Sequence, residues 1–117
     1  MNAVHLKQVK FHARHGLYNG EADTGGDFEV QLSVWYEQAG SITQINQTID
    51  YTVLYQLLQQ QMQQRQDLLE TIADQLCAAI HQEFPFVKEI VVEIDKLHPP
   101  IAGFEGRTGI TCKRNFS

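Results

Sequence analysis

The stretch DFEVQLSVWY, residues 27–36, alternates apolar and polar side chains without a break. Successive side chains of a β-strand point to opposite faces of the sheet, so this alternation predicts a strand with one apolar and one polar face. The apolar face is expected to carry Phe28, Val30, Leu32, Val34 and Tyr36. The rest of the fold is predicted by working outward from this strand in both directions.

Three other segments predict strands. In VHLKQVKFHARH, residues 4–15, the apolar positions change phase midway, and a bulge near Lys7–Gln8 would reconcile the two phases. Residues 87–96, VKEIVVEIDK, predict the third strand, and residues 106–114, GRTGITCKR, predict a weaker fourth. The segment HGLYNGEADTGGD, residues 15–27, is too long and too rich in glycine for a tight hairpin, which favours a functional loop.

Two segments predict amphipathic helices, namely TVLYQLLQQQMQQRQ (52–66) and DLLETIADQLCAAIHQEF (67–84). Asp67 and Glu70 have the spacing of a capping box at the start of the second helix. The order strand, strand, helix, helix, strand, strand predicts an α+β fold with a four-stranded antiparallel sheet and two helices on one face. The length of 117 residues fits a single domain, residues 1–117.

A four-stranded sheet in one subunit exposes two unpaired edges. Oligomers that join such sheets edge to edge into a barrel remove this liability, so an oligomer is a reasonable expectation.

The overall composition narrows the class of function. The net charge is −5 and no dense run of lysine and arginine occurs, which argues against a nucleic-acid partner. The N-terminal residues carry charges where a secretory signal would be apolar, and no segment approaches the roughly 18–20 apolar residues that span a bilayer. We therefore expect a cytoplasmic protein with no membrane partner. Cys77 and Cys112 are expected to be isolated core residues, with neither a disulfide nor a metal between them.

A lysine closes the third strand in IDKLHPPIAGF, residues 94–104. Lys96 keeps the phase of Ile94 and the apolar positions before it, so a regular strand points its side chain toward the rim of the apolar face. Such a lysine can take part in proton transfer. The alternative is a frayed strand end whose lysine reaches into water. Pro99 and Pro100 are expected to end the strand pairing just beyond it.

The chain resembles the dihydroneopterin aldolase family, the retro-aldol enzymes of folate biosynthesis. The resemblance rests on four segments that span almost the whole chain and occur in the family's order: FHARHGLYNGE with GGDFEVQL, then TIDYTVLYQLL, then DLLETIADQL, and finally IDKLHPPIAGF. It implies a tunnelling fold, in which four subunits join their sheets into a barrel and two such rings commonly stack as an octamer. It also implies active sites between neighbouring subunits.

The resemblance also implies the residues of the site. Lys96 matches the catalytic lysine, and Glu70 matches the carboxylate that anchors the pterin, with the backbone of Leu69 beside it. Tyr51, placed just before the first helix, matches a tyrosine supplied by the adjoining subunit, and Glu21 matches a loop glutamate that completes the pocket. With Glu70 assigned to the ligand, Asp67 is expected to cap the helix alone. The resemblance further implies a reaction that needs no metal, no cofactor and no Schiff base, because the pterin ring itself accepts the electrons of the broken bond.

Three alternatives stay open. An epimerase acting on dihydroneopterin or its triphosphate would use the same proton transfers, and a triphosphate would favour basic residues near the pocket, for which Arg14 and Arg107 are candidates. A catalytically silent ring that binds pterins or purines is a second alternative. A zinc site is a third, but His12 and His15 lack a third ligand in the sequence pattern.

Overall fold

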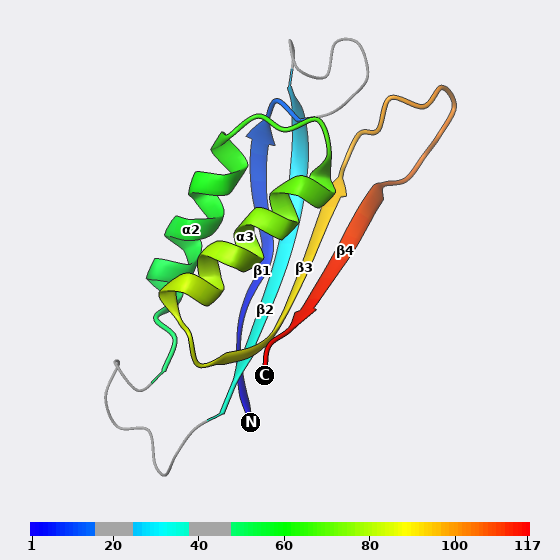
Figure 1. Ribbon diagram of the computed structural model, residues 1–117. Coiled ribbons are helices and arrows are strands. Elements are labelled where there is room, and N and C mark those ends of the chain that lie inside the picture. The colour runs from blue at the N-terminus through cyan, green and yellow to red at the C-terminus, as the bar shows by residue number, and fades with distance from the viewer. Residues whose placement is uncertain (16–24, 38–47) are drawn as a thin grey trace.

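Four strands form one antiparallel sheet in the order β1-β2-β3-β4, and two helices cover one face of it (Figure 1). The computed structural model describes residues 1–15, 25–37 and 48–117. The strands are β1 (Asn2–Ala13), β2 (Gly26–Tyr36), β3 (Val87–Lys96) and β4 (Thr108–Asn115). The predicted α+β architecture is confirmed.

Strand β2 lies inside the sheet and supplies the centre of the core. The five apolar side chains predicted to share its face are all buried, each with at most 4% of its surface exposed. The helices α2 (Tyr51–Gln63) and α3 (Leu69–Glu83) pack their apolar stripes against this face. Helix α2 contacts β1, and α3 contacts β3 and β4, so the two helices together cover the sheet.

The bulge predicted in β1 is confirmed. The register of β1 against β2 shifts between Leu6 and Val9, and Gln8 adopts a positive φ of 54°. The extra residue restores the apolar phase, so that the residues on both sides of the bulge pack against the core.

The cap predicted for the second helix is wrong. Leu68 occupies the N-cap position of α3 and makes no side-chain capping bond. The carboxylate of Asp67 instead lies 3.0 Å from the guanidinium of Arg65, at the surface. Helix α2, by contrast, has a side-chain cap that the sequence pattern did not reveal, because Asp50 accepts a hydrogen bond of 2.9 Å from the backbone N–H of Thr52.

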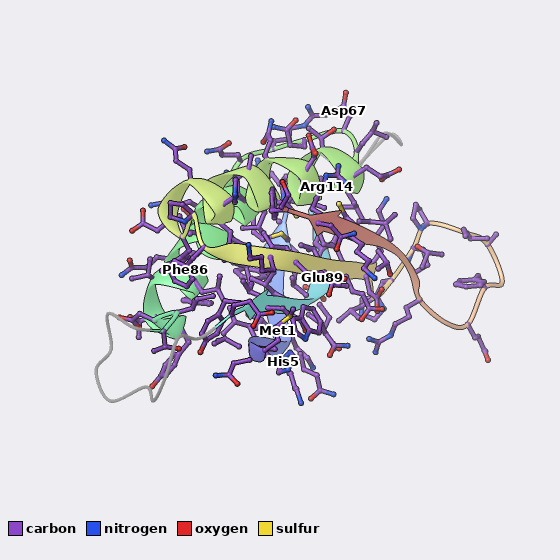
Figure 2. All side chains as sticks on the ribbon, turned by 60° about the horizontal axis from the view of Figure 1, so that its bottom comes forward. Met1, His5, Asp67, Phe86, Glu89 and Arg114 are labelled. Atoms are coloured by element: carbon purple, nitrogen blue, oxygen red, sulfur yellow. The ribbon has the colours of Figure 1, made fainter. Side chains whose placement is uncertain are left out.

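The face of the sheet turned away from the helices is polar. Lys113 pairs with Glu89 at 2.9 Å, and Arg107 lies 3.3 Å from Glu29 on this face. Figure 2 shows His5 and Glu89 on the side of the sheet away from the helices, whereas Arg114 lies between β4 and α3. A charged outer face keeps this side of the sheet compatible with water.

The two cysteines are not isolated from each other, which corrects the expectation from sequence. Both are free thiols, and that of Cys77 on α3 lies against that of Cys112 on β4. Burial, and after it the neighbouring Cys112, raises the pKa of Cys77 to about 12. Cys77 is therefore a protonated core residue at neutral pH. Among the described residues, no helix is both long and apolar enough to cross a membrane.

Candidate functional site

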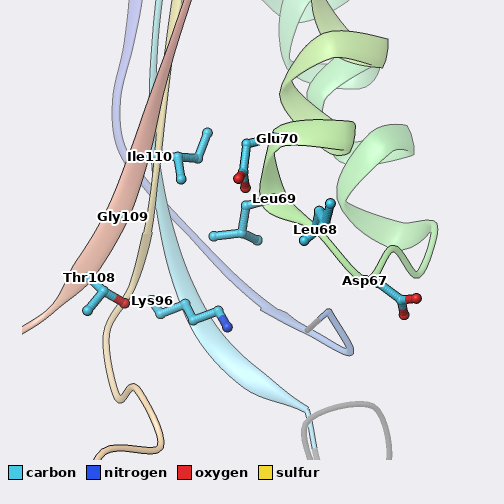
Figure 3. Close-up of a pocket in the computed structure, with 8 residues that line it drawn as sticks. All are labelled: Asp67, Leu68, Leu69, Glu70, Lys96, Thr108, Gly109 and Ile110. Atoms are coloured by element: carbon cyan, nitrogen blue, oxygen red, sulfur yellow. The ribbon is translucent and has the colours of Figure 1, made fainter. Parts of the chain in front are cut away.

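A cleft of about 220 Å³ opens between the start of α3 and the adjoining ends of β3 and β4. Figure 3 shows the eight residues that line it, which are Asp67, Leu68, Leu69, Glu70, Lys96, Thr108, Gly109 and Ile110. One wall comes from the helix and the segment before it, and the other comes from the sheet. The topology creates this cleft because β3 ends at the same end of the molecule where α3 begins (Figure 1).

Lys96 stands on the sheet wall of the cleft. It is the last residue of β3, with Phe28 of β2 and Thr108 of β4 as its cross-strand neighbours. The strand does not fray before it, and its side chain extends from the inner face toward the start of α3 (Figure 3). The direction predicted from the strand register is confirmed. One further backbone hydrogen bond, from the N–H of Leu97 to the carbonyl of Asp27, follows it before the prolines.

Glu70 and Leu69 stand on the helix wall. Leu69 is the first residue of α3 and Glu70 the second, so the carboxylate lies in the first helical turn. Anions are stabilised there by the unpaired N–H groups and the helix dipole. Within the described residues, no hydrogen bond or ion pair engages the Glu70 carboxylate, which is exposed in the single chain. It is therefore available to a ligand.

The charged and the apolar side chains of the cleft occupy different positions. A carboxylate and an amine stand on opposite walls. The apolar side chain of Leu69 lies between them, and that of Ile110 lies on the sheet wall beside Glu70 (Figure 3). A flat heterocycle with N–H donors at one end and a reacting group at the other would match this arrangement. Its donors would meet the carboxylate, and its reacting group would meet the amine.

Tyr51 does not reach this cleft in a single chain. It is the first residue of α2, 64% exposed, and lines a separate surface hollow with Leu6 and Tyr55. Helix α2 spans about 18 Å from this end to the end that leads to α3, at ~1.5 Å per residue. The sequence analysis placed Tyr51 just before the helix, whereas it belongs to the helix itself. Glu21, the remaining predicted site residue, lies outside the described residues.

A buried histidine was missed by the sequence analysis as part of this region. His15 is 2% exposed and is hydrogen bonded at both ring nitrogens to the segment that precedes the cleft wall. The signal was present, because His15 continues the inward-facing phase of Phe11 and Ala13. It was considered only as a zinc ligand with His12. In the structure His12 pairs separately with Asp27 at 2.9 Å, and the described residues contain no group of three metal-binding side chains.

Comparison with known proteins agrees with the fold and shows the family. The family model for dihydroneopterin aldolase matches residues 4–113. The dihydroneopterin aldolase of Streptococcus pyogenes is 30% identical, and the alignment covers 97% of this chain and 98% of that protein. The Bacillus subtilis enzyme of the same name is 28% identical over the full length of both chains.

Among solved structures, the Escherichia coli dihydroneopterin aldolase in complex with neopterin superposes with a TM-score of 0.84. Its sequence identity is 14%, and the match covers 98% of this chain and all of the other. This structural likeness confirms the tunnelling fold, and the sequence matches extend over almost the entire chain. The protein belongs to the dihydroneopterin aldolase family.

Proposed function

We infer that the protein is a dihydroneopterin aldolase, a lyase of folate biosynthesis. It converts 7,8-dihydroneopterin into 6-hydroxymethyl-7,8-dihydropterin and glycolaldehyde. The observation that carries this inference is the cleft itself, in which Glu70 of α3 and Lys96 of β3 stand on opposite walls. Family membership supplies the substrate, and the two charged groups match what that substrate requires.

The pterin end of the substrate explains the carboxylate. A pterin presents an exocyclic amino group and a ring N–H side by side, and an ionised carboxylate can accept a hydrogen bond from each. Glu70 takes this role, and the backbone of Leu69 lies beside it. Leu69 and Ile110 contact the flat ring, so that binding combines charge-assisted hydrogen bonds with apolar contact.

The side-chain end of the substrate explains the amine. The hydroxyl on the second carbon of the side chain loses its proton, and the bond between the first and second carbons breaks. Glycolaldehyde leaves, and the bonding electrons move into the ring C=N group to give an enol-like intermediate. A proton added to the first side-chain carbon then completes the product. Lys96 acts as general base and acid in these transfers, directly or through water.

Two further groups complete the proposed site. Tyr51 of a second copy assists protonation of the intermediate, and Glu21 completes the pocket and orders the catalytic water. The described chain leaves the edges β1 and β4 without a strand partner, so copies can join edge to edge into a ring of four, and two rings into an octamer. The single domain of residues 1–117 is the repeating unit. A cytoplasmic location stays a prediction.

One incubation tests the function. The purified protein is mixed with 7,8-dihydroneopterin, and the products are identified by chromatography together with an assay for glycolaldehyde. Equal amounts of hydroxymethyl-dihydropterin and glycolaldehyde are expected. Formation of the epimer without glycolaldehyde would identify an epimerase instead, and tight pterin binding with no product would identify a silent binding ring.

A further inference from the structure

His15 joins the end of α2 to the segment that leads into the cleft. Its ring is 2.8 Å from the carbonyl oxygen of Met62 through Nε2, and its Nδ1 accepts a hydrogen bond of 3.1 Å from the backbone N–H of Gln66. These two backbone groups are four residues apart. In a continuous α-helix the N–H of Gln66 would bond directly to the carbonyl of Met62.

The imidazole therefore stands in for one helical hydrogen bond. Glutamine is a good helix former, and the glutamines after Met62 favour a helix that continues to about residue 66. Instead α2 ends at Gln63, and Gln64 turns to an extended conformation. The inserted ring explains this early end, because it satisfies both backbone groups while holding them apart.

This bridge requires one protonation state. Because Nδ1 accepts the N–H of Gln66, the ring hydrogen is on Nε2, where it donates to the Met62 carbonyl. A doubly protonated ring would face the Gln66 N–H with a second donor. Burial lowers the pKa of His15, and the positive charge of Arg65 lowers it further, whereas the bond to Met62 opposes them. Arg65 lies on the segment to which His15 is hydrogen bonded. Arg14, which immediately precedes His15 in the chain, is exposed.

The ring contacts residues that adjoin both walls of the cleft. Gln66 immediately precedes Asp67 and Leu68 on the helix wall. On the other side, the ring packs edge-on against Phe28, with centroids 5.5 Å apart, and Phe28 is the cross-strand neighbour of Lys96. We propose that His15 is a positioning residue that sets where α3 begins and thereby holds Glu70 opposite Lys96. The inference rests on the proposed function for its ligand, a pterin.

Three variants test it. His15→Leu removes both hydrogen bonds, His15→Gln keeps a donor and an acceptor that do not titrate, and His5→Leu is the control at an exposed histidine of β1. Neopterin binding is measured by fluorescence between pH 5.5 and 8, well below the melting temperature of each variant. His15→Leu should bind about ten-fold more weakly at pH 8, since small displacements of a site are costly. His15→Gln should recover most of the affinity and lose less of it than the wild type as the pH falls.

NMR of the ligand-free protein separates this inference from the function. Signals of the Glu70 carboxylate and the Lys96 side chain should move in His15→Leu and stay in place in His5→Leu. If they move but no variant binds neopterin, the proposed function fails and the role of His15 stands. Unchanged signals together with unchanged affinity would overturn the role of His15.

A measurement on the wild type covers the case in which His15→Leu does not fold. Because binding and protonation are linked, neopterin should lower the pKa of His15 as followed by its ring signals. The same ring pKa with and without bound neopterin would also overturn the proposal.

Discussion

Lys96 is a charged residue held at the end of a fully paired strand. Its backbone is fixed on both sides by β2 and β4, so its position does not depend on the loop that follows. In the proposed mechanism the pterin is bound from the other wall, by Glu70. Removing the amine should therefore affect the reaction far more than the binding of the substrate.

The variant Lys96→Ala tests this separation. Turnover of 7,8-dihydroneopterin should fall by roughly 10²–10⁴-fold, the range for loss of a general acid–base group. Neopterin affinity should stay close to that of the wild type in a fluorescence titration. Lys113→Ala, which removes a strand lysine from the opposite face of the sheet, is the matched control. An undiminished rate in Lys96→Ala would show that this lysine is not the proton-transfer group.

Glu70 should show the reverse pattern. Glu70→Gln keeps the shape of the side chain but removes the charge and one acceptor, so neopterin should bind about 10- to 100-fold more weakly. Titration calorimetry measures the change, with Asp67→Asn as the control on the same wall, since Asp67 pairs with Arg65. Equal affinity of Glu70→Gln and the wild type would exclude Glu70 as the pterin anchor.

His15 makes a prediction for stability as well as for binding. Its pKa in the folded protein lies below the ordinary value of 6.5, so the unfolded chain takes up the proton first as the pH falls. The contribution of neutral His15 is complete above pH 6.5, declines as the pH falls below it, and levels off below the folded pKa. Urea unfolding from pH 8 to pH 5 should show a steeper loss in the wild type than in His15→Gln. If the stabilities of the wild type and of His15→Gln fell in parallel with pH, this role of His15 in stability would be contradicted.

At the scale of elements, the two helix starts differ in their caps. Asp50 caps α2 through both the backbone N–H and the hydroxyl of Thr52, and these bonds lower its pKa. The variant Asp50→Ala should lower the melting temperature by roughly 4 °C, as expected for a lost N-cap in a domain of this size. Asp67→Ala is the matched control, because Asp67 precedes a helix without capping it. A larger loss from Asp67→Ala than from Asp50→Ala, in thermal unfolding followed by circular dichroism, would reverse the assignment.

The sheet could be predicted from sequence more fully than the helix ends. Strand alternation is a local property, so β3 was predicted with its observed bounds, Val87–Lys96, and the change of phase in β1 predicted its bulge. The end of α2 depends on His15, which is 47 residues away from Met62 in the chain, and no local pattern contains that contact. The capping-box spacing at Asp67 was misleading for a different, local reason: its carboxylate pairs with Arg65, and the helix begins one residue later than a cap at that position requires.

The residues of the candidate site also differ in how far the sequence alone could locate them. The strand register gave the direction of Lys96, and helical periodicity placed Glu70 near a helix start, so both could be located from sequence. That the two groups face each other across a cleft follows only from the topology, which brings the end of β3 to the start of α3 (Figure 3). Tyr51 was assigned to the site by resemblance, and one chain places it in a different hollow.

At the scale of the whole molecule, one chain holds an incomplete set of the proposed groups. Lys96 and Glu70 lie beside β4, whereas Tyr51 lies in a hollow with Leu6 of β1. Strands β1 and β4 are the two edges of the sheet. Edge-to-edge joining of copies would place the β1 side of one next to the β4 side of another. Each such subunit interface, or seam, would then contain Lys96 and Glu70 of one copy and Tyr51 of the other.

Mixed oligomers of two inactive variants test this arrangement. Lys96→Ala and Tyr51→Ala copies are co-expressed with different tags, and oligomers that carry both tags are isolated. A seam is intact when a Tyr51→Ala copy supplies the lysine and its neighbour, a Lys96→Ala copy, supplies the tyrosine. Random 1:1 assembly makes about one seam in four intact, so about a quarter of wild-type turnover should return. Lys96→Ala mixed with Glu70→Ala should show no more turnover than the two variants show separately, because both groups belong to the cleft of one chain. Doubly tagged oligomers that stay inactive in the first mixture would show that Tyr51 does not act across the seam.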